Sequence, residues 1–479
     1  MREATVRVLP RSAEGTAGGS RSAYRAVHTN EVAQAASAFA LGQSVPGART
    51  AADPREARAT PQLMPFLALT AQLTLLLVVF KAFRLEEPGF FALSCAMFGG
   101  FAVHYWLPFQ LKQPFWIALS IAGAFLLLET RVAVLLIAVG LALFGILASR
   151  LPYVARVAVV AVVFAGVMYG RATPGFELGS GWLYVPPHFW TVFGGVFMFR
   201  MIVYLYDLRH MRERPSVRDF LGYFFLLPNY YFLLFPVIDF QTLKRGFFAR
   251  DIHDVAQQGI HWIVRGTIQL LIYRLIYHLK PPSTPDVVTS AESLAIMMVL
   301  TYLLYLRVSG QFHIIVGMLH LYGYDLPETQ RRYLLASSLT DFWRRINIYW
   351  KDFMVKVVYF PAYFRLRKHG EARAQVIATG LVFVATWLLH SYQYFWLTGR
   401  PLLSWPDVTF WTILGVLMVG NVLLELRRPR PVAAPPLQRR LLRVPAIAGT
   451  FATICVLWSL WNAPSLTAWF DLITWWRIG

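Results

Sequence analysis

Two polar side chains in the second half of the chain have the types and surroundings that acid–base chemistry within a membrane requires. His390 lies deep inside an apolar segment, 374–396, and Asn347 lies in an aromatic and basic stretch, 338–360. An ionisable imidazole is costly to keep in a membrane span, so His390 is a candidate for function. We therefore expect His390 and Asn347 to form a catalytic pair at bilayer depth. The alternative for His390 is a structural histidine, hydrogen-bonded to a neighbouring carbonyl inside the helix bundle.

The residues around Asn347 predict how its carboxamide is presented. If 341–352 is read as one helix, Trp343, Asn347 and Trp350 share a face at helical spacing, and basic side chains occupy another face. This pattern places a polar group among indole rings beside a cationic stripe. The alternative is an amphipathic helix that lies at the membrane surface, with aromatic anchors and basic side chains that reach toward water.

A similar polar and aromatic patch surrounds His390 on its own helix. Trp387, Ser391 and Tyr394 lie three positions before, one after and four after the histidine. Such neighbours are close enough on a helix to contact the ring or a molecule bound beside it.

The composition indicates an all-α, polytopic membrane protein. Hydrophobic residues make up 57% of the 479 positions, and only 15% are charged, whereas a soluble protein carries about 25% charged residues. The net charge of +20 comes largely from short loops between apolar segments, which is the pattern of cytoplasmic loops and does not indicate nucleic-acid binding. Cys95 and Cys455 both fall within predicted spans, which argues against a disulfide framework or a metal cluster.

The apolar runs predict about eleven membrane spans. These are 64–83, 90–107, 114–128, 132–148, 157–170, 188–206, 258–279, 290–308, 374–396, 408–425 and 444–461. We expect a disordered cytoplasmic tail over 1–60, N-terminal spans over 61–206, a catalytic core over 207–400 and C-terminal spans over 401–479. The basic loops 209–218, 365–373 and 427–443 should face the cytoplasm, which predicts a multi-pass protein of the cell's inner (plasma) membrane.

Two further apolar stretches are expected not to cross the membrane. The first, 219–239, contains Pro228 and Pro236, and should be a broken, re-entrant segment. The second, 309–325, is expected to be re-entrant or interfacial, since this keeps the basic loops on one side. Together with the spans, these segments should surround a central polar tunnel.

The stretch 309–325 also carries repeated histidines and glycines. His313 and His320 are seven residues apart, as are Gly310 and Gly317. The histidines could line a polar groove or bind a metal, but no third ligand lies at a suitable spacing, so no metal site is predicted. The glycines are better explained by close packing of two helices.

The motifs over 309–361 resemble the core of the membrane-bound O-acyltransferase family, in its branch of alginate O-acetyltransferase and the D-alanyl transfer protein of teichoic acid synthesis. The matching residues are Ser309-Gly310, Gly317, the run from Gly323 to Glu328, and Asp341-Phe342-Trp343-Arg344-Arg345 followed by Asn347-Ile348. His390 matches by place the family's histidine on a later hydrophobic helix, although this chain has Leu389-His390-Ser391 where the branch usually has Trp-His-Gly. The stretch from Tyr230 to Phe240 resembles the family's proline-containing re-entrant segment, so the likeness covers roughly residues 200–400.

This resemblance implies transfer of an acyl group, expected to be acetyl, from a thioester to a hydroxyl of a cell-surface polysaccharide or another secreted acceptor. His390 would act as the general base and Asn347 as the donor that stabilises the oxyanion. No tightly bound cofactor is implied, since the donor is acyl-CoA or an acyl-carrier thioester whose phosphates basic side chains could attract. The candidates for substrate contacts are Trp343, Arg344, Arg345, Lys351, Trp387 and Ser391.

Three other functions remain open on the sequence. The acceptor could be a lipid alcohol within the bilayer. The chain could be a transporter, which would move a substrate without consuming a thioester. It could also relay an acyl group to a separate extracytoplasmic acyltransferase partner, as occurs in the related alginate and teichoic acid systems.

Overall fold

A computed structural model describes residues 53–173, 185–211, 216–281, 283, 288–427 and 436–477. These residues fold into helices, and the described part of the chain contains no β-strand beyond an isolated bridge between Phe247 and Tyr324. The prediction of an all-α, polytopic membrane protein is therefore confirmed. Most of the predicted tail, 1–52, lies outside the described residues, as do 212–215 and 428–435 of the basic loops. The end of that predicted tail, Pro54–Arg58, is the short helix α2.

Nine helical segments of the described chain are long and apolar enough to cross a membrane. They are α3 (Leu63–Phe83), α4 (Pro88–Trp106), α6 (Thr130–Ala148), α7 (Tyr153–Ala172), α8 (Pro187–His210), the nearly continuous pair α12 (Ala291–Leu303) and α13 (Leu306–His320), α17 (Glu371–Thr398), α18 (Trp405–Arg427) and the Arg443–Trp461 part of α19 (Pro436–Trp461). Two other predicted spans form the long helices α5 (Phe109–Leu127) and α11 (Ile252–Leu279), which are less apolar. Lys112 near the start of α5, and Arg265 and Arg274 along α11, account for this difference.

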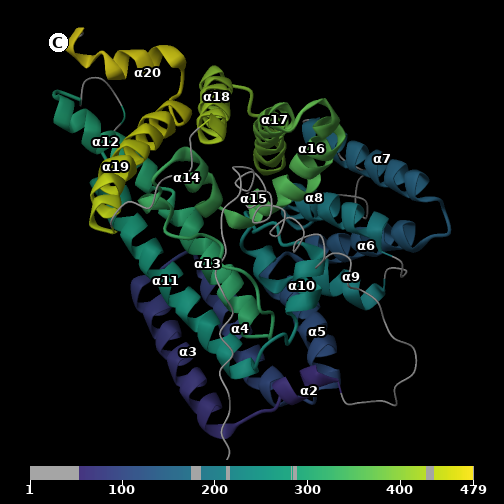
Figure 1. Ribbon diagram of the computed structural model, residues 1–479. Coiled ribbons are helices and arrows are strands. Elements are labelled where there is room, and N and C mark those ends of the chain that lie inside the picture. The colour runs from purple at the N-terminus through teal and green to yellow at the C-terminus, as the bar shows by residue number, and fades with distance from the viewer. Residues whose placement is uncertain are drawn as a thin grey trace, which may run out of the picture. The chain divides into compact units, whose positions relative to one another are not determined.

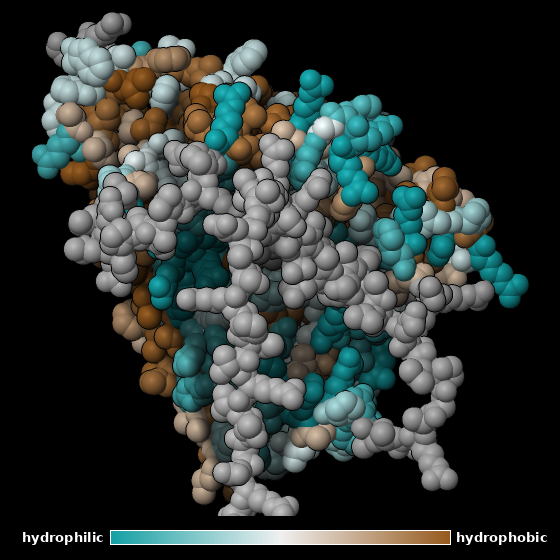
Figure 2. Space-filling view, viewed as in Figure 1, coloured by the Kyte–Doolittle hydropathy of each residue, from teal (hydrophilic) through white to brown (hydrophobic). Residues whose placement is uncertain are grey.

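The outer surface of the C-terminal helices is apolar, as a lipid-facing surface must be. Figure 2 shows hydrophobic residues gathered around α18 and α19. Val416 and Leu424 of α18 and Val456 of α19 are among the exposed side chains there. Because lipid tails solvate such groups without penalty, this exposure fits a helix bundle that faces hydrocarbon.

Helices α11 and α13 form the most intimate helix pair, and glycines make it possible. They run side by side in Figure 1. A Cβ atom placed on Gly317 would lie 2.5 Å from the carbonyl oxygen of Gly259, and one on Gly310 would lie 2.8 Å from that of Gly266. The prediction that Gly310 and Gly317 permit close helix packing is confirmed, and Gly259 and Gly266 are their partners.

The position of α13 corrects one prediction from the sequence. The stretch 309–325 was expected to be re-entrant or interfacial, but its part up to His320 continues the candidate span that begins at Ala291, and almost every residue from Ser309 to His320 is buried. The helix follows α12 after a turn at Leu304 and Tyr305 and then packs along α11. Its glycines, together with apolar side chains on all faces, favour this interior position over the membrane surface.

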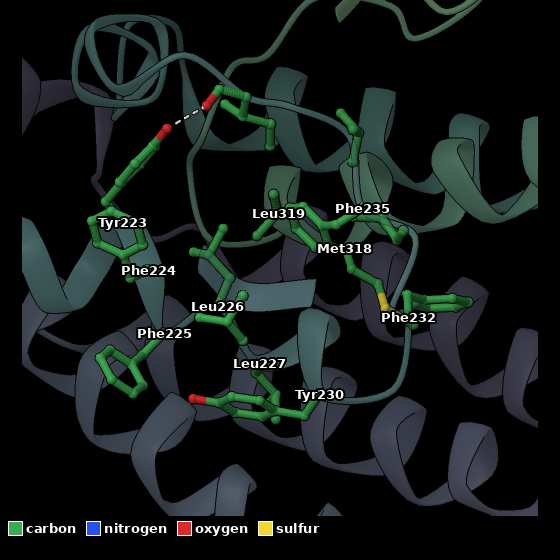
Figure 3. Close-up of a cluster of buried hydrophobic side chains, with 14 of the residues drawn as sticks. Tyr223, Phe224, Phe225, Leu226, Leu227, Tyr230, Phe232, Phe235, Met318 and Leu319 are labelled. Carbon is green, nitrogen blue, oxygen red and sulfur yellow. Dashed lines mark hydrogen bonds between the residues drawn. The ribbon is translucent and has the colours of Figure 1, made fainter. Parts of the chain in front are cut away.

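The broken segment 219–239 has the form that its prolines predict. It consists of α9 (Val217–Phe224), a short 3-10 turn η2 (Leu227–Tyr230) and an extended stretch that leads to α10 (Phe240–Gly246). Its side chains gather with Met318 and Leu319 of α13 (Figure 3). Buried Arg200 of α8 donates to the carbonyl oxygens of Tyr223 and Phe224, at 2.8 and 3.1 Å. Non-helical backbone is tolerated at this depth because such donors satisfy it.

The stretch that carries Asn347 is not the single helix that its side-chain pattern predicts. It divides into α14 (Leu339–Arg345), α15 (Ile348–Met354), a π-helical turn η4 (Val355–Tyr359) and α16 (Phe360–Leu366). The break lies at Asn347, whose backbone is left-handed with φ 40°. The separated ends are paired elsewhere, since the amide of Ile348 donates to Thr329 and the carbonyl of Arg345 accepts from Arg331. The single-helix interpretation was therefore wrong. The cap that Asn347 provides to α15, and the hydrogen bonds with the backbone of Thr329 and Arg331, replace the hydrogen bonds of a continuous helix.

Candidate active site

A cavity of about 270 Å³ brings the two predicted catalytic residues together. Both His390 of α17 and Asn347 line it. Its walls come from α8, the segment after η2, α13, α14, α15, α17, α18 and α19. The cavity therefore joins parts of the chain that are separated by more than two hundred positions, and both predicted residues face one space.

In the imidazole of His390, Nδ1 forms a hydrogen bond within the helix and Nε2 is left to accept a proton. Its Nδ1 lies 2.9 Å from the backbone carbonyl oxygen of Thr386. A carbonyl only accepts, so Nδ1 carries the proton in the neutral ring and Nε2 keeps its lone pair. The hydrogen bond to a neighbouring carbonyl that a structural histidine would make is therefore present. This bond uses only Nδ1, so Nε2 can still act as a base beside the cavity.

Three indole rings surround this imidazole. The ring centre of His390 lies 5.0 Å from that of Trp350, 4.9 Å from that of Trp411 and 6.0 Å from that of Trp461. These tryptophans come from α15, α18 and α19, and all three line the cavity. We call them the indole cage. They restrict the imidazole to one orientation and exclude water from part of its surface.

Asn347 both caps a helix and lines the cavity. Its side-chain Oδ1 accepts a hydrogen bond of 3.2 Å from the backbone amide of Trp350 and so caps the start of α15. Asparagine is among the few residues that tolerate a left-handed backbone and cap a helix at the same position. The cap uses only the oxygen, so the Nδ2 amide hydrogens remain available as donors toward the cavity.

The other predicted substrate contacts divide into two groups. Trp343 and Lys351 line the cavity, and Lys351 lies 2.7 Å from Asp352. The remaining four do not line it. Arg344 is exposed, and Arg345 pairs with Asp341 at 2.6 Å. Trp387 donates to Asp407 at 2.7 Å, and Ser391 is buried.

Several lining residues were not identified from the sequence. Gln393 lies one helical turn after His390 and faces the same cavity, so its spacing could have revealed it. Trp411, Trp458 and Trp461 come from the C-terminal helices, beyond the region of family resemblance. No local pattern connects those helices with His390, because their contribution depends on tertiary packing.

The cavity is more aromatic than the predicted polar tunnel. Its polar lining consists of Asn347, Lys351, Thr386, His390 and Gln393, together with aromatic groups that carry a polar atom. All the remaining lining residues are phenylalanine, leucine, isoleucine or valine. The expectation of a polar passage is corrected to an apolar, aromatic cavity with a few converging polar groups, which is the usual character of a small-molecule site.

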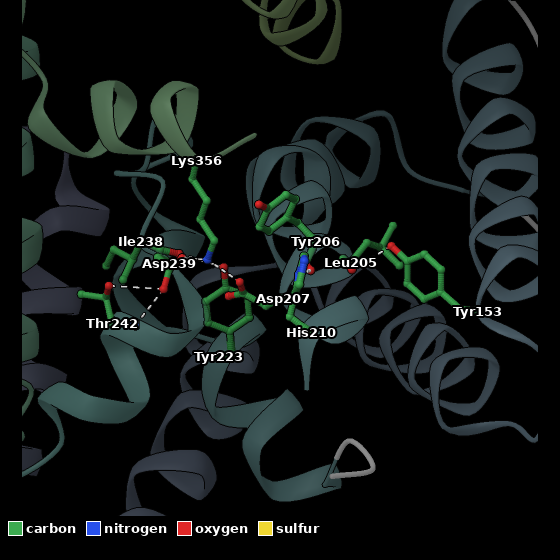
Figure 4. Close-up of polar contacts among 10 residues, drawn as sticks. All are labelled: Tyr153, Leu205, Tyr206, Asp207, His210, Tyr223, Ile238, Asp239, Thr242 and Lys356. Carbon is green, nitrogen blue, oxygen red and sulfur yellow. Dashed lines mark hydrogen bonds and ion pairs between the residues drawn. The ribbon is translucent and has the colours of Figure 1, made fainter. Parts of the chain in front are cut away.

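One wall of the cavity is held in place by a partly buried charge cluster. Lys356 of η4 forms ion pairs with Asp207 of α8 and Asp239 of the broken segment (Figure 4). Burial alone would lower the pKa of Lys356, but the carboxylates of Asp239 and Asp207 raise it above its ordinary value. The ammonium therefore stays charged and fixes the broken segment, whose residues Leu234, Phe235 and Val237 border the cavity.

The two histidines of α13 have structural partners. Nδ1 of His313 lies 2.8 Å from the carbonyl oxygen of Ser309, and Nδ1 of His320 lies 2.8 Å from that of Val316. Nε2 of His320 also accepts from the amide of Leu326 at 3.3 Å. Within the described ranges, no group of three histidine, cysteine or acidic side chains is arranged to hold a metal ion. Neither histidine lines the cavity.

No protein-family model matches this chain, and no curated protein matches its sequence.

Proposed function

We propose that this protein is a membrane-bound O-acyltransferase that moves an acyl group from a thioester to a hydroxyl. The observation that supports this most strongly is that one largely apolar cavity is lined by both His390, with Nε2 free to accept a proton, and Asn347, with a free amide donor. A base and an oxyanion donor are the two groups that acyl transfer to an alcohol needs most.

In the proposed reaction, the acceptor hydroxyl gives its proton to Nε2 of His390 while its oxygen attacks the thioester carbonyl. Asn347 donates to the carbonyl oxygen as negative charge develops there. The carbon–sulfur bond then breaks, and the proton on His390 passes to the departing thiolate. The products are an ester and a free thiol, so no external oxidant, reductant or resident metal is required.

The donor is proposed to be acyl-CoA or an acyl-carrier thioester. Lys351 lies on the cavity, where it is paired with Asp352, and Arg344 is exposed on α14. These cations would attract a phosphate-bearing donor, with the carboxylate of Asp352 offsetting part of the charge of Lys351. The acyl group is proposed to be acetyl, and the acceptor a hydroxyl of a cell-surface polysaccharide at the inner (plasma) membrane. A separate extracytoplasmic acyltransferase partner would complete the transfer if this chain only relays the group.

A lipid alcohol is the second candidate acceptor, and the lining of the cavity favours it. Phe199, Phe235, Phe312 and Phe342 are among the apolar lining residues. An apolar wall solvates a hydrocarbon chain better than it solvates a sugar, which needs several hydrogen-bonding partners. This candidate keeps the same base and the same donor.

Purified protein in lipid nanodiscs, supplied with acetyl-CoA and either a saccharide or a lipid alcohol, tests the proposal. Release of free thiol, together with an acetyl mass added to one acceptor, is expected. In proteoliposomes, which enclose a compartment, substrate movement across the membrane without thiol release would instead identify a transporter. Mass spectrometry of surface glycans and lipids from cells with and without the protein would show which acceptor is used in vivo.

A further inference from the structure

Asp407 is a buried carboxylate that takes no part in the proposed reaction. It lies in the first turn of α18 and is only 1% exposed. The structure gives it no ion pair with any described Lys, Arg or His side chain. A carboxylate in such a place needs strong hydrogen-bond donors, because burying an unpaired charge is costly.

Two indole N–H groups satisfy this carboxylate. Nε1 of Trp387 donates to its Oδ2 at 2.7 Å, and Nε1 of Trp461 donates to its Oδ1 at 2.8 Å. Trp387 comes from α17 and Trp461 from α19, so Asp407 joins three helices through one side chain. The start of a helix also stabilises a negative charge. Both oxygens are therefore engaged in charge-assisted hydrogen bonds of good length.

These hydrogen bonds lead directly to His390. Trp387 precedes it by one helical turn on α17, and Trp461 is a member of the indole cage. Trp411, another member, follows Asp407 by one turn on α18, with its ring 4.9 Å from that of His390. Asp407 thus bonds directly to one member of the cage, Trp461 of α19, and ties it to Trp387 of α17. Among the described contacts, Asp407 is linked to His390 through Trp461, whose ring centre lies 6.0 Å from that of the imidazole.

The cage suits the charged form of the ring that the proposed reaction creates. When Nε2 takes a proton, the imidazole becomes a cation, and the faces of indole rings attract cations. The carboxylate of Asp407, bonded to Trp461 of the cage, adds a favourable electrostatic interaction in an apolar setting. The arrangement favours the state with a proton on His390 over the resting state, which is what raises a turnover rate.

We propose that Asp407 is a positioning residue for His390, acting through Trp387 and Trp461 to hold the indole cage that orients the imidazole and stabilises its protonated form. The catalytic role of Asp407 rests on the proposed function. The effect of Asp407 on the orientation and proton affinity of His390 does not depend on it.

The first test is steady-state kinetics on the full chain in nanodiscs. Asp407→Asn keeps one acceptor oxygen but removes the charge and turns an N–H toward an indole N–H, so we expect kcat to fall roughly tenfold with KM within about twofold. Trp387→Phe keeps a ring and loses only the N–H at a position outside the cavity, so it should give a smaller loss of kcat. Glu371→Gln removes an exposed carboxylate from the helix that carries His390 and is the matched control. A rise in KM alone, or equal effects of Asp407→Asn and Glu371→Gln, would overturn the inference.

The second test does not depend on acyltransferase activity. Diethyl pyrocarbonate acylates neutral imidazole nitrogen, and peptide mass spectrometry gives the labelling of His390 relative to exposed His261. Loss of the carboxylate should make His390 less nucleophilic, so the ratio should fall in Asp407→Asn and remain unchanged in Glu371→Gln. An unchanged or higher ratio in Asp407→Asn would overturn the inference. A wild-type chain that releases no thiol, yet shows the fall in labelling, would refute the acyltransferase proposal alone.

Discussion

Replacement of Lys356 by methionine is expected to destabilise the protein far more than loss of an ordinary surface lysine. The ammonium forms ion pairs with Asp207 and Asp239, which are 4% and 25% exposed, and is itself 20% exposed. Methionine fills a similar volume but leaves two carboxylates facing each other without a cation. Breaking a buried pair from one side costs about 3–5 kcal/mol, and the partial exposure of Asp239 places our estimate near 3 kcal/mol.

The measurement is the free energy of unfolding in mixed micelles, followed by tryptophan fluorescence. Lys244→Met is the matched control, because Lys244 forms a 2.9 Å ion pair with Asp219 but is 42% exposed, and such pairs contribute less than about 1 kcal/mol. A triple variant with Lys356→Met, Asp207→Asn and Asp239→Asn should recover most of the loss, since asparagine can still cap α10 in place of Asp239. Equal losses in the two lysine variants, or no recovery in the triple variant, would refute the reasoning.

Three further predictions concern the site and its support. Asn347→Asp keeps the cap on α15 but removes the amide donor, so turnover should fall on the order of a hundredfold with little change in the unfolding free energy; unchanged turnover would remove Asn347 from the site. Gly317→Ala places a methyl group against the backbone of Gly259, so it should destabilise the protein by about 1–3 kcal/mol in the same unfolding assay, whereas Gly380→Ala, which meets open space, should not. The hydrogen bond from Arg250 holds the pKa of Asp325 below its ordinary value. The ionised carboxylate of Asp325 therefore stabilises the folded protein above about pH 4, the pKa of the unfolded chain, and this stabilisation is lost as the pH falls through the pKa of the folded protein. Arg250→Gln should therefore lower stability by less than about 1 kcal/mol at neutral pH and make acid unfolding less steep, and an unchanged acid transition would count against this pair.

Local sequence patterns were sufficient for the features that depend on one segment at a time. The apolar runs predicted the helical membrane fold, the prolines of 219–239 predicted its broken course, and the spacing of Gly310 and Gly317 predicted close helix packing. Each of these follows from a property that a short segment has in any context. The cost of a histidine in a span likewise directed attention to His390.

Features that depend on distant segments could not be predicted in this way. The break at Asn347 requires both its left-handed backbone and the hydrogen bonds from 329–331. The pattern of Trp343, Asn347 and Trp350 fits an unbroken helix equally well. Two members of the indole cage, Trp411 and Trp461, and Asp407 come from α18 and α19, and nothing in those helices alone indicates that they enclose an imidazole. The burial of α13 likewise depends on its fit against α11.

The most direct test of the central claim, that Nε2 of His390 is the base of an acyl transfer, is thiol release from acetyl-CoA by the His390→Gln variant in nanodiscs. Glutamine keeps a polar group of similar reach but cannot take the proton, and His261→Gln, on exposed α11 surface, is the matched control. We predict that His390→Gln lowers acceptor-dependent thiol release by at least about a hundredfold, while the folded protein is recovered in normal yield and His261→Gln remains fully active. Wild-type rates in His390→Gln would contradict the account.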